Sequence, residues 1–228
     1  MLRPRRTGVF LGRPISAAGW KVRRSGGGML RFLVADRGQG SRELCGISPG
    51  EEAELIGPLG EPWPLEDIQI KSNSNRGKSL EPIALIGGGV GIAPLLLFAG
   101  ELGKQPFDFY AGFKSGSFGL EHIKPRSLVV SSEDGSVGVK GRITDFFSPL
   151  GYSAVFACGP EPMLKILSKV CMALLIPCFV SVERRMACGV GACLACTVKT
   201  APKTGQEVYR HCCTDGPVFR AEEIVFEA

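Results

Sequence analysis

The chain has 228 residues, 44% of them hydrophobic, and a formal net charge of +5. This length suits two or three small domains, and the apolar content is ample for ordinary cores. Because the charge is modest and spread along the chain, it does not indicate a nucleic-acid-binding protein. The nine cysteines are an odd number, and no secretory signal precedes them. We therefore expect a cytoplasmic protein whose thiols stay reduced and available to metal.

Residues 1–63 contain short alternating runs such as Leu30–Ala35, separated by glycine turns at 26–28, 38–40 and 48–50. This pattern predicts a small antiparallel barrel or sheet. The segment is also rich in arginine and lysine. These basic residues indicate either a site for an anionic cofactor or acidic partner, or a solvated face.

Two patterns in this block could bind a ligand. Arg13-Pro14-Ile15-Ser16 combines a proline of fixed φ with a guanidinium and a hydroxyl, which suits a rigid strand end that holds a planar, phosphate-bearing ligand. The stretch Gly38-Gln39-Gly40-Ser41 offers backbone amides and a hydroxyl to a phosphate. An ordinary turn is the alternative at both places.

Residues 64–82 include the polar stretch 71–79, which indicates a loop or linker. Residues 83–176 then alternate apolar strands with helical patterns. The expected strands are Ile83–Ile86, Phe107–Phe113, Ser127–Ser131 and Ala154–Cys158. Such alternation predicts a parallel α/β sheet with a nucleotide site at its carboxyl edge.

The stretch from Ile83 to Gly100 carries no charge and must be tested as a membrane span. It contains internal glycines and Pro94, with β-rich residues first and leucines later. A buried strand, a glycine turn and a helix explain this order better than a membrane span does.

Two turns in this block could receive a nucleotide. The first follows a predicted strand and opens a predicted helix, so its glycines allow close approach of a pyrophosphate and its free amides favour the negative charge. Its key residues are Gly87, Gly88, Gly89, Gly91 and Pro94. The second turn, Cys158-Gly159-Pro160, also joins a strand to a helix, and together the two turns suit a nicotinamide. The glycine spacing is not that of the dinucleotide fingerprint, so a turn without ligand and a plain buried Cys158 thiol remain alternatives.

Cysteines near the C-terminus carry the strongest signal. Cys188, Cys193 and Cys196 have the spacing C-x4-C-x2-C, and two further cysteines follow at 212 and 213. This spacing is typical of a plant-type [2Fe-2S] site, which moves single electrons. Gly189 and Gly191 supply the backbone freedom for a tight curl. Successive side chains of an extended segment point opposite ways, so only one of Cys212 and Cys213 should face the cluster.

Three other kinds of cysteine site compete with this interpretation. Zinc usually takes two close cysteine pairs, whereas here three cysteines cluster and one stands apart. A Rieske centre needs two histidine ligands, and the only histidines are His122 and His211, at unrelated spacing. Structural thiols would be more scattered and less flanked by glycine.

Taken in this order, the motifs resemble the electron-transfer subunits of NAD-dependent dihydroorotate dehydrogenase, a branch of the ferredoxin-reductase family. Besides the motifs above, the resemblance rests on Gly57-Pro58-Leu59-Gly60, on Glu133 to Gly138, on Glu183 to Cys193 and on Cys213-Thr-Asp-Gly-Pro-Val-Phe219. It covers nearly the whole chain. In that family the cysteine before x-Asp-Gly-Pro is the fourth cluster ligand, which implies Cys213.

The resemblance implies a fold of three domains: an antiparallel flavin-binding barrel at 1–63, shortened at its start, a parallel α/β NAD-binding domain at 83–176 and a small [2Fe-2S] domain at 177–228, with a linker at 64–82. It implies FAD held by Arg13 to Ser16, by Leu33, Val34 and Ala35, and by Gly40 and Ser41. NAD would bind at 87–94 and 158–160, and the cluster at Cys188, Cys193, Cys196 and Cys213.

The resemblance further implies an FMN-containing dihydroorotate dehydrogenase partner, in a heterotetramer of two copies of each subunit, with no membrane. The electrons would serve pyrimidine (UMP) biosynthesis. Two alternatives remain. One is the flavin and iron-sulfur subunit of a sulfhydrogenase or of a ferredoxin:NADP reductase complex, which shares the same parts. The other is a zinc-stabilised binding module without a redox role.

Overall fold

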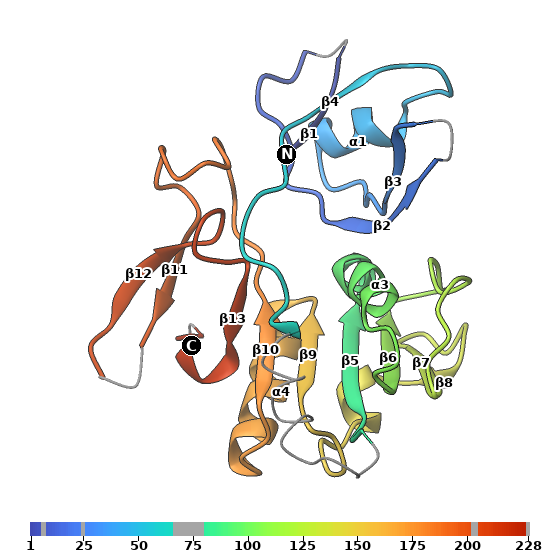
Figure 1. Cartoon of the computed structure of the whole chain (residues 1–228), viewed down its shortest axis with the longest axis vertical. Coiled ribbons are helices and arrows are strands. Elements are labelled where there is room, and N and C mark those ends of the chain that lie inside the picture. The colour runs from blue at the N-terminus through green and yellow to red at the C-terminus, as the bar shows by residue number, and fades with distance from the viewer. Residues whose placement is uncertain (6–7, 24–25, 66–79, 202–204, 227–228) are drawn as a thin grey trace.

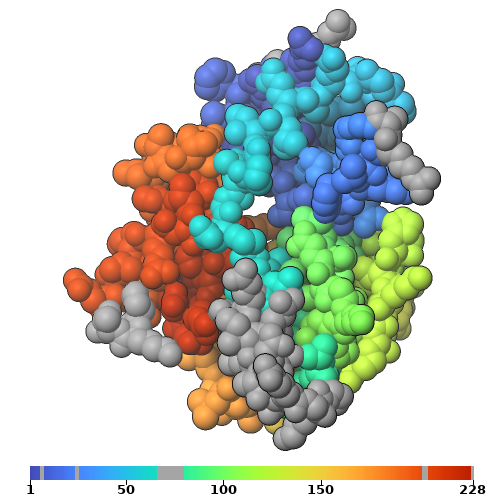
Figure 2. Space-filling view, in the orientation of Figure 1, coloured from blue at the N-terminus to red at the C-terminus, as the bar shows by residue number. Residues whose placement is uncertain are grey.

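The computed structural model describes residues 1–5, 8–23, 26–65, 80–201 and 205–226. They form an N-terminal part, a central sheet and a C-terminal part (Figure 1). Figure 2 shows the cyan segment that ends near residue 65 running from the N-terminal part toward the sheet. The polar stretch 71–79 that the sequence assigns to a loop or linker lies outside the described residues.

The N-terminal part contains four short strands and one helix: β1 (Leu2–Pro4), β2 (Ala17–Val22), β3 (Gly28–Phe32), α1 (Gln39–Cys45) and β4 (Ala53–Leu55). β1 pairs with β4, and β2 pairs with β3, both antiparallel. Within the described residues these strands make two separate two-stranded sheets and no closed barrel. Barrel closure needs every strand to pair on both sides, and each of these strands pairs with only one other strand.

Two of the basic residues of this part form ion pairs across the first sheet. Arg3 pairs with Glu54, and Arg5 pairs with Glu52. All four side chains are at least about one-third exposed, so each pair contributes no more than about 1 kcal/mol. For these two arginines the solvated face is the better interpretation.

The central sheet has seven strands in the order β13-β10-β9-β5-β6-β7-β8. All neighbours are parallel except β13, which runs antiparallel to β10. The strands are β5 (Ile83–Gly88), β6 (Phe107–Phe113), β7 (Ser127–Ser132), β8 (Val139–Lys140), β9 (Val155–Cys158), β10 (Cys178–Ser181) and β13 (Val218–Arg220). The four strands expected from the sequence are all present, and β5 and β9 are buried throughout, as apolar runs in the middle of a parallel sheet are.

Among the described residues, one helix packs on each face of the sheet. After the 3₁₀ turn η1 (Gly89–Gly91), α3 (Ile92–Glu101) packs on one face. α4 (Glu161–Ala173) packs on the other face, together with the 3₁₀ turn η2 (Ile143–Phe146). α4 buries Leu164, Leu167, Ser168 and Cys171, a spacing of three and four residues that places them on one side of a helix.

The uncharged stretch 83–100 forms β5, η1 and most of α3, as the sequence predicts. Among the residues that the structure describes, no helix has the length and apolar character needed to cross a membrane.

The sheet extends beyond residue 176, where the sequence places the end of the nucleotide-binding domain. β10 pairs with β9 in parallel, and β13 adds an antiparallel edge strand. The remaining C-terminal elements are the hairpin of β11 (Thr197–Thr200) and β12 (Val208–His211) and the 3₁₀ turn η3 (Ala221–Glu223). The C-terminal part therefore contributes β10 and β13 to the central sheet, while β11 and β12 pair as a separate two-stranded sheet.

Aromatic and small residues join the N-terminal part to the sheet. The Trp63 ring lies 5.8 Å from that of Phe98 and 5.7 Å from that of Phe156, between ring centroids. Ala18 of β2 is fully buried in the core around α3. Leu33 also packs against this core. Its Cδ1 would lie 3.0 Å from a Cβ placed on Gly119. These contacts hold the flavin-binding candidate residues beside the first helix of the sheet.

Candidate redox centre

The two expected nucleotide turns lie in direct contact at the carboxyl edge of the sheet. β5 and β9 are parallel neighbours, so the turns that follow them meet. A Cβ placed on Gly91 would lie 2.5 Å from the carbonyl oxygen of Cys158, and one on Gly88 would lie 2.7 Å from Pro160 Cδ. These glycines are therefore required for close packing between the turns, whatever ligand binds there.

Gly89 differs from the other glycines of the first turn. Its φ of +55° lies in the left-handed region, and a Cβ placed on it would have no neighbour within 4 Å. It is therefore the position of this turn where the backbone faces open space. Pro94 lies in the first turn of α3, where a missing N–H costs no helical hydrogen bond.

Cys158 is a buried thiol at the end of β9. It is only 3% exposed, and burial raises its pKa to about 12. The raised pKa favours the protonated thiol at neutral pH and disfavours the thiolate that a nucleophile or base would need. This setting suits a packing residue beneath the turn.

The Arg13 guanidinium packs against the start of α1. A Cβ placed on Gly40 would lie 2.3 Å from Arg13 Nε, so only glycine fits there without displacing the arginine. The stretch expected as a phosphate-binding turn is in fact the first turn of this helix. The structure thus brings together two of the expected flavin-binding segments, Arg13 to Ser16 and Gly40-Ser41.

The Ser41 hydroxyl is fully engaged within its own turn. Its oxygen accepts the backbone N–H of Arg37 at 2.8 Å and that of Gly38 at 3.1 Å, and its hydrogen is donated to the Gly38 carbonyl at 3.0 Å. It therefore shapes the turn and leaves phosphate contacts to neighbouring groups. Leu33, Val34 and Ala35 are half-buried between β3 and α1.

The cysteine loop curls as its glycines predict. Gly189, Gly191 and also Leu194 have left-handed φ angles of 75°, 80° and 58°. The curl directs the backbone N–H groups of Val190 and Cys193 toward the Cys188 sulfur, at 3.4 Å each. Hydrogen bonds of this kind stabilise a thiolate, and they lower the pKa of Cys188 to about 6.

Four thiols from two arms of the chain lie close together. Cys188 interacts with Cys193, and Cys196 interacts with Cys213. Burial first, and then the neighbouring Cys196 thiol, raise the pKa of Cys213, while the Gly191 amide donates to the Cys213 sulfur and opposes this shift. Crowding of this kind favours metal binding, because a metal replaces the thiol protons.

Cys212 faces the other way. Its thiol donates to the Val182 carbonyl at 3.2 Å inside the core, and burial raises its pKa to about 12. Its backbone N–H donates to the Cys196 carbonyl at 2.9 Å, which ties the two arms together. The opposite directions of Cys212 and Cys213 agree with the sequence argument that only one of them faces the cluster.

Cys188 interacts with Cys193 and Cys196 with Cys213, and Cys188 also acts on Cys213 across the two arms. Within the described residues, no group of three His, Cys, Asp or Glu side chains has the geometry to hold a single metal ion. Each iron of a [2Fe-2S] cluster takes two of the four cysteine ligands, so the pairs Cys188 with Cys193 and Cys196 with Cys213 fit such a cluster.

An ion pair that the sequence analysis did not identify connects this loop to the nucleotide turns. Arg184 Nη1 donates to Glu161 Oε2 at 3.0 Å, where Glu161 begins α4 directly after the Cys158–Pro160 turn. The two side chains are 25% and 39% exposed. In the sequence, only the Glu-Arg-Arg stretch ahead of the cysteines pointed to this ion pair, because Glu161 lies 23 residues before Arg184.

Comparison with known proteins identifies the family. Residues 183–225 match the model described as the iron-sulfur cluster binding domain of dihydroorotate dehydrogenase B. The chain is 37% identical over 198 residues to the dihydroorotate dehydrogenase B (NAD(+)) electron transfer subunit of Clostridium acetobutylicum, covering 86% of this chain and 74% of the relative. The chain belongs to this electron-transfer subunit family. The relative from Clostridium perfringens is 36% identical over 224 residues, which cover 96% of this chain and 82% of its own length.

Solved structures of other reductases have a similar fold. The structure of NADH-dependent reduced ferredoxin-NADP oxidoreductase matches with a TM-score of 0.77 at 27% identity, over 99% of this chain and 78% of that one. The cytochrome P450 reductase GcoB of Amycolatopsis matches with a TM-score of 0.54 at 22% identity, over 75% and 55%, which indicates the fold alone. The resemblance drawn from the sequence motifs is confirmed.

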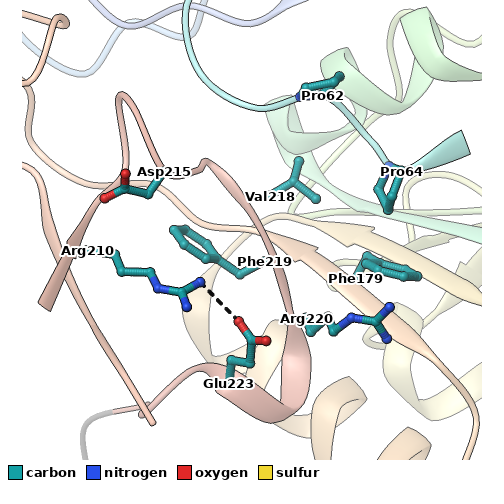
Figure 3. Close-up of a pocket in the computed structure, with 9 residues that line it drawn as sticks. All are labelled: Pro62, Pro64, Phe179, Arg210, Asp215, Val218, Phe219, Arg220 and Glu223. Carbon is teal, nitrogen blue, oxygen red and sulfur yellow. Dashed lines mark hydrogen bonds and ion pairs between the residues drawn. The ribbon is translucent and has the colours of Figure 1, made fainter. Parts of the chain in front are cut away.

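A hollow of about 250 Å³ lies between the segment around Pro62 and Pro64 and the elements β10, β12 and β13 (Figure 3). Its lining residues are Pro62, Pro64, Phe179, Arg210, Asp215, Val218, Phe219, Arg220 and Glu223. Arg210 pairs with Glu223 at 3.3 Å, and the Arg220 guanidinium lies 5.2 Å from the centre of the Phe179 ring. None of the expected site residues lines this hollow. The charges of its two arginines are balanced by the carboxylates of Asp215 and Glu223.

The lowered pKa of Cys188 predicts its reactivity in protein freed of iron. We expect alkylation of Cys188 by iodoacetamide to be half-maximal near pH 6 and to remain fast at pH 7, because the thiolate is lost only as the pH falls through the pKa. Peptide mapping by mass spectrometry across pH 5 to 9 measures this. Cys212 should stay unlabelled while the protein is folded. A midpoint for Cys188 near the ordinary thiol value of about 8.5 would contradict the assigned hydrogen bonds.

Proposed function

We propose that the chain is the electron-transfer subunit of a dihydroorotate dehydrogenase, passing electrons from an FMN-containing catalytic partner to NAD+ in pyrimidine (UMP) biosynthesis. The observation that carries this proposal is the gathering of four thiols, from Cys188 to Cys213, in the region that matches the iron-sulfur domain of that family. Membership of the family supports the partner, and two copies of each subunit would form a heterotetramer.

We assign to each site the residues expected from the sequence, and the contacts described above support this assignment. Cys188, Cys193, Cys196 and Cys213 hold the [2Fe-2S] cluster. FAD binds at Arg13 to Ser16, Leu33 to Ala35 and Gly40-Ser41, where the Arg13 guanidinium supplies the positive charge for a phosphate. NAD binds over Gly87 to Gly91, Pro94 and Cys158 to Pro160. When bound, the flavin accepts the single electrons of the cluster and delivers the pair that NAD+ requires.

We propose the domain limits drawn from the sequence. Residues 1–63 would form the flavin-binding part, whose described strands pair antiparallel. Residues 64–82 form the linker, 83–176 the NAD-binding part and 177–228 the cluster part, with β10 and β13 lending two strands to the shared sheet. All nine cysteines are free thiols, which supports a cytoplasmic location.

The cluster loop is the surface where we expect the partner to bind. Val190 and Leu194 are 57% and 59% exposed, and they lie within two residues of Cys188 and Cys193. Apolar side chains beside the cluster would be covered by the subunit that delivers electrons, because docking there brings the two redox groups close together.

Coexpression with the FMN-containing catalytic subunit tests this proposal. We expect the two chains to copurify, the anaerobic complex to show the visible absorption of flavin and [2Fe-2S], and dihydroorotate to drive NAD+ reduction. A colourless protein that contains zinc and no iron would contradict it and support the zinc-stabilised module.

A Leu194→Glu change should weaken the association of the subunits by at least about tenfold, since it places a charge in the apolar contact. Leu175→Glu is the matched control. Leu175 is also an exposed leucine with a left-handed φ, but it follows the C-terminal end of α4, away from the cluster loop. Equal affinity of both variants, measured by titration calorimetry, would mean that the partner binds elsewhere.

A second candidate is the flavin and iron-sulfur subunit of a ferredoxin:NADP reductase complex. The structural match to NADH-dependent reduced ferredoxin-NADP oxidoreductase favours it. Reduction of the purified chain by ferredoxin, with no response to dihydroorotate and the catalytic subunit, would support this candidate over the first.

A further inference from the structure

The turn at Gly57–Glu61, called here the 57–61 turn, contacts the arm that carries Cys213. The Glu61 backbone N–H donates to the Gly216 carbonyl at 2.6 Å, and Glu61 forms a bridge with Pro217. Gly60 has a φ of +79°, and a Cβ placed on it would lie 2.5 Å from the Gly216 carbonyl oxygen. The two backbones are therefore so close that no side chain fits at position 60.

The same turn contacts the other cluster arm. A Cβ placed on Gly189 would lie 3.2 Å from Leu59 Cδ1 and 2.7 Å from Met1 Cγ. Gly189 is buried and follows Cys188 directly. Leu59 thus packs against the backbone of the curl that holds the first cluster thiol, while Glu61 binds the arm of the fourth.

Hydrogen bonds continue from this turn to the flavin-binding candidate Arg13. The Ile56 N–H donates to the Met1 carbonyl at 2.9 Å, and Leu2 pairs with Leu55 in the β1–β4 sheet. Leu2 and Arg13 then exchange two backbone hydrogen bonds of 2.8 and 2.7 Å. Short, directly bonded segments therefore connect both cluster arms to the N-terminal part.

We propose that the 57–61 turn sets the position of the cluster relative to the flavin, and that Leu59 is the positioning residue that holds the Cys188 curl in place. The inference rests on the proposed function and assigns a role to a motif that no site has yet used. The rate of electron transfer depends on the separation and orientation of the two groups, so a packing contact at this point affects the rate.

The test compares Leu59→Ala with Leu80→Ala in the full chain. Both leucines are 37% exposed, but Leu80 precedes β5 and belongs to no proposed site. After mixing with NADH in a stopped-flow instrument, the flavin should bleach at the wild-type rate in both variants. Bleaching of the cluster should be at least fivefold slower in Leu59→Ala alone, with iron content and cluster spectrum unchanged.

A second measurement needs no cofactor. In iron-free protein, the amides of Val190 and Cys193, which donate to Cys188, should exchange with solvent at least fivefold faster in Leu59→Ala than in Leu80→Ala. Leu59→Met, which conserves volume, should restore both the exchange rate and the rate of cluster reduction. A purely structural role would lower the melting temperature of both alanine variants without this difference.

The outcomes separate the inference from the function on which it rests. Equal cluster reduction and equal amide exchange in the two alanine variants would overturn the positioning role of Leu59. If Leu59→Ala fails to retain the cluster, Leu59→Val is measured in its place, with the same two results deciding. Wild-type protein without flavin or iron would instead contradict the proposed function.

Discussion

Replacing Cys213 by serine is expected to remove the visible absorption of the cluster and to reduce dihydroorotate-dependent NAD+ reduction in the reconstituted complex to background. Cys213 is the thiol of the second arm that interacts with Cys196 and receives the Gly191 amide. Without it, one iron loses one of its two cysteine ligands. Cys193→Ser should have the same effect on the first pair. Iron analysis and the absorption spectrum measure the loss independently of turnover.

Cys212→Ser is the matched control, since it makes the same change one residue away. The Cys212 thiol donates to the Val182 carbonyl inside the core, and a serine hydroxyl can donate to the same oxygen. We therefore expect an intact cluster spectrum and unchanged NAD+ reduction. Loss of the cluster in Cys212→Ser, with its retention in Cys213→Ser, would transfer the fourth ligand to residue 212.

The central strands could be predicted because their signal is local. Ile83–Ile86 and Phe107–Phe113 are apolar runs bounded by turns, and the structure places β5 and β6 there. The cysteine loop was predictable for the same reason, since the spacing of Cys188, Cys193 and Cys196 and their glycines lie within nine residues. A site whose residues all lie within one short segment can therefore be predicted from the sequence.

Elements that depend on distant partners could not be predicted. β13 joins the sheet only by pairing with β10, almost 40 residues earlier, so nothing near Val218 shows that it extends the sheet past residue 176. The stretch Gly38–Ser41 contains two glycines and reads as a turn, whereas it opens α1, whose buried Leu44 anchors it. Tertiary packing overrides a local signal of this strength.

The contacts around the cysteine loop likewise join residues that lie far apart in the sequence. Leu59 reaches Gly189, and Arg184 reaches Glu161, across 130 and 23 positions of the chain. The sequence showed these residues only as parts of motifs without a role. Leu59 lies against the backbone at Gly189 and Arg184 bonds to the Glu161 carboxylate, and only the folded chain brings these partners together.

Adding a side chain at Gly89 is expected to weaken NAD binding without destabilising the protein. A Cβ at this position has no neighbour within 4 Å, so the new group would project into the space that the nucleotide needs. Asparagine is the suitable replacement, because it tolerates the left-handed conformation that the φ of +55° imposes. We expect the KM for NAD+ to rise at least about tenfold, equivalent to about 1.4 kcal/mol of binding free energy.

Two comparisons separate ligand contact from packing in this prediction. Gly103→Asn introduces the same residue at a φ of +59°, also without neighbours, but beyond the far end of α3, and should leave the KM unchanged. Gly91→Ala places a Cβ 2.5 Å from the Cys158 carbonyl and should lower the free energy of unfolding by about 1–3 kcal/mol. Steady-state kinetics and urea unfolding measure these effects. If Gly89→Asn and Gly103→Asn gave the same KM, NAD would not bind over the first turn, and its glycines would serve only to let the two turns of the sheet edge pack together.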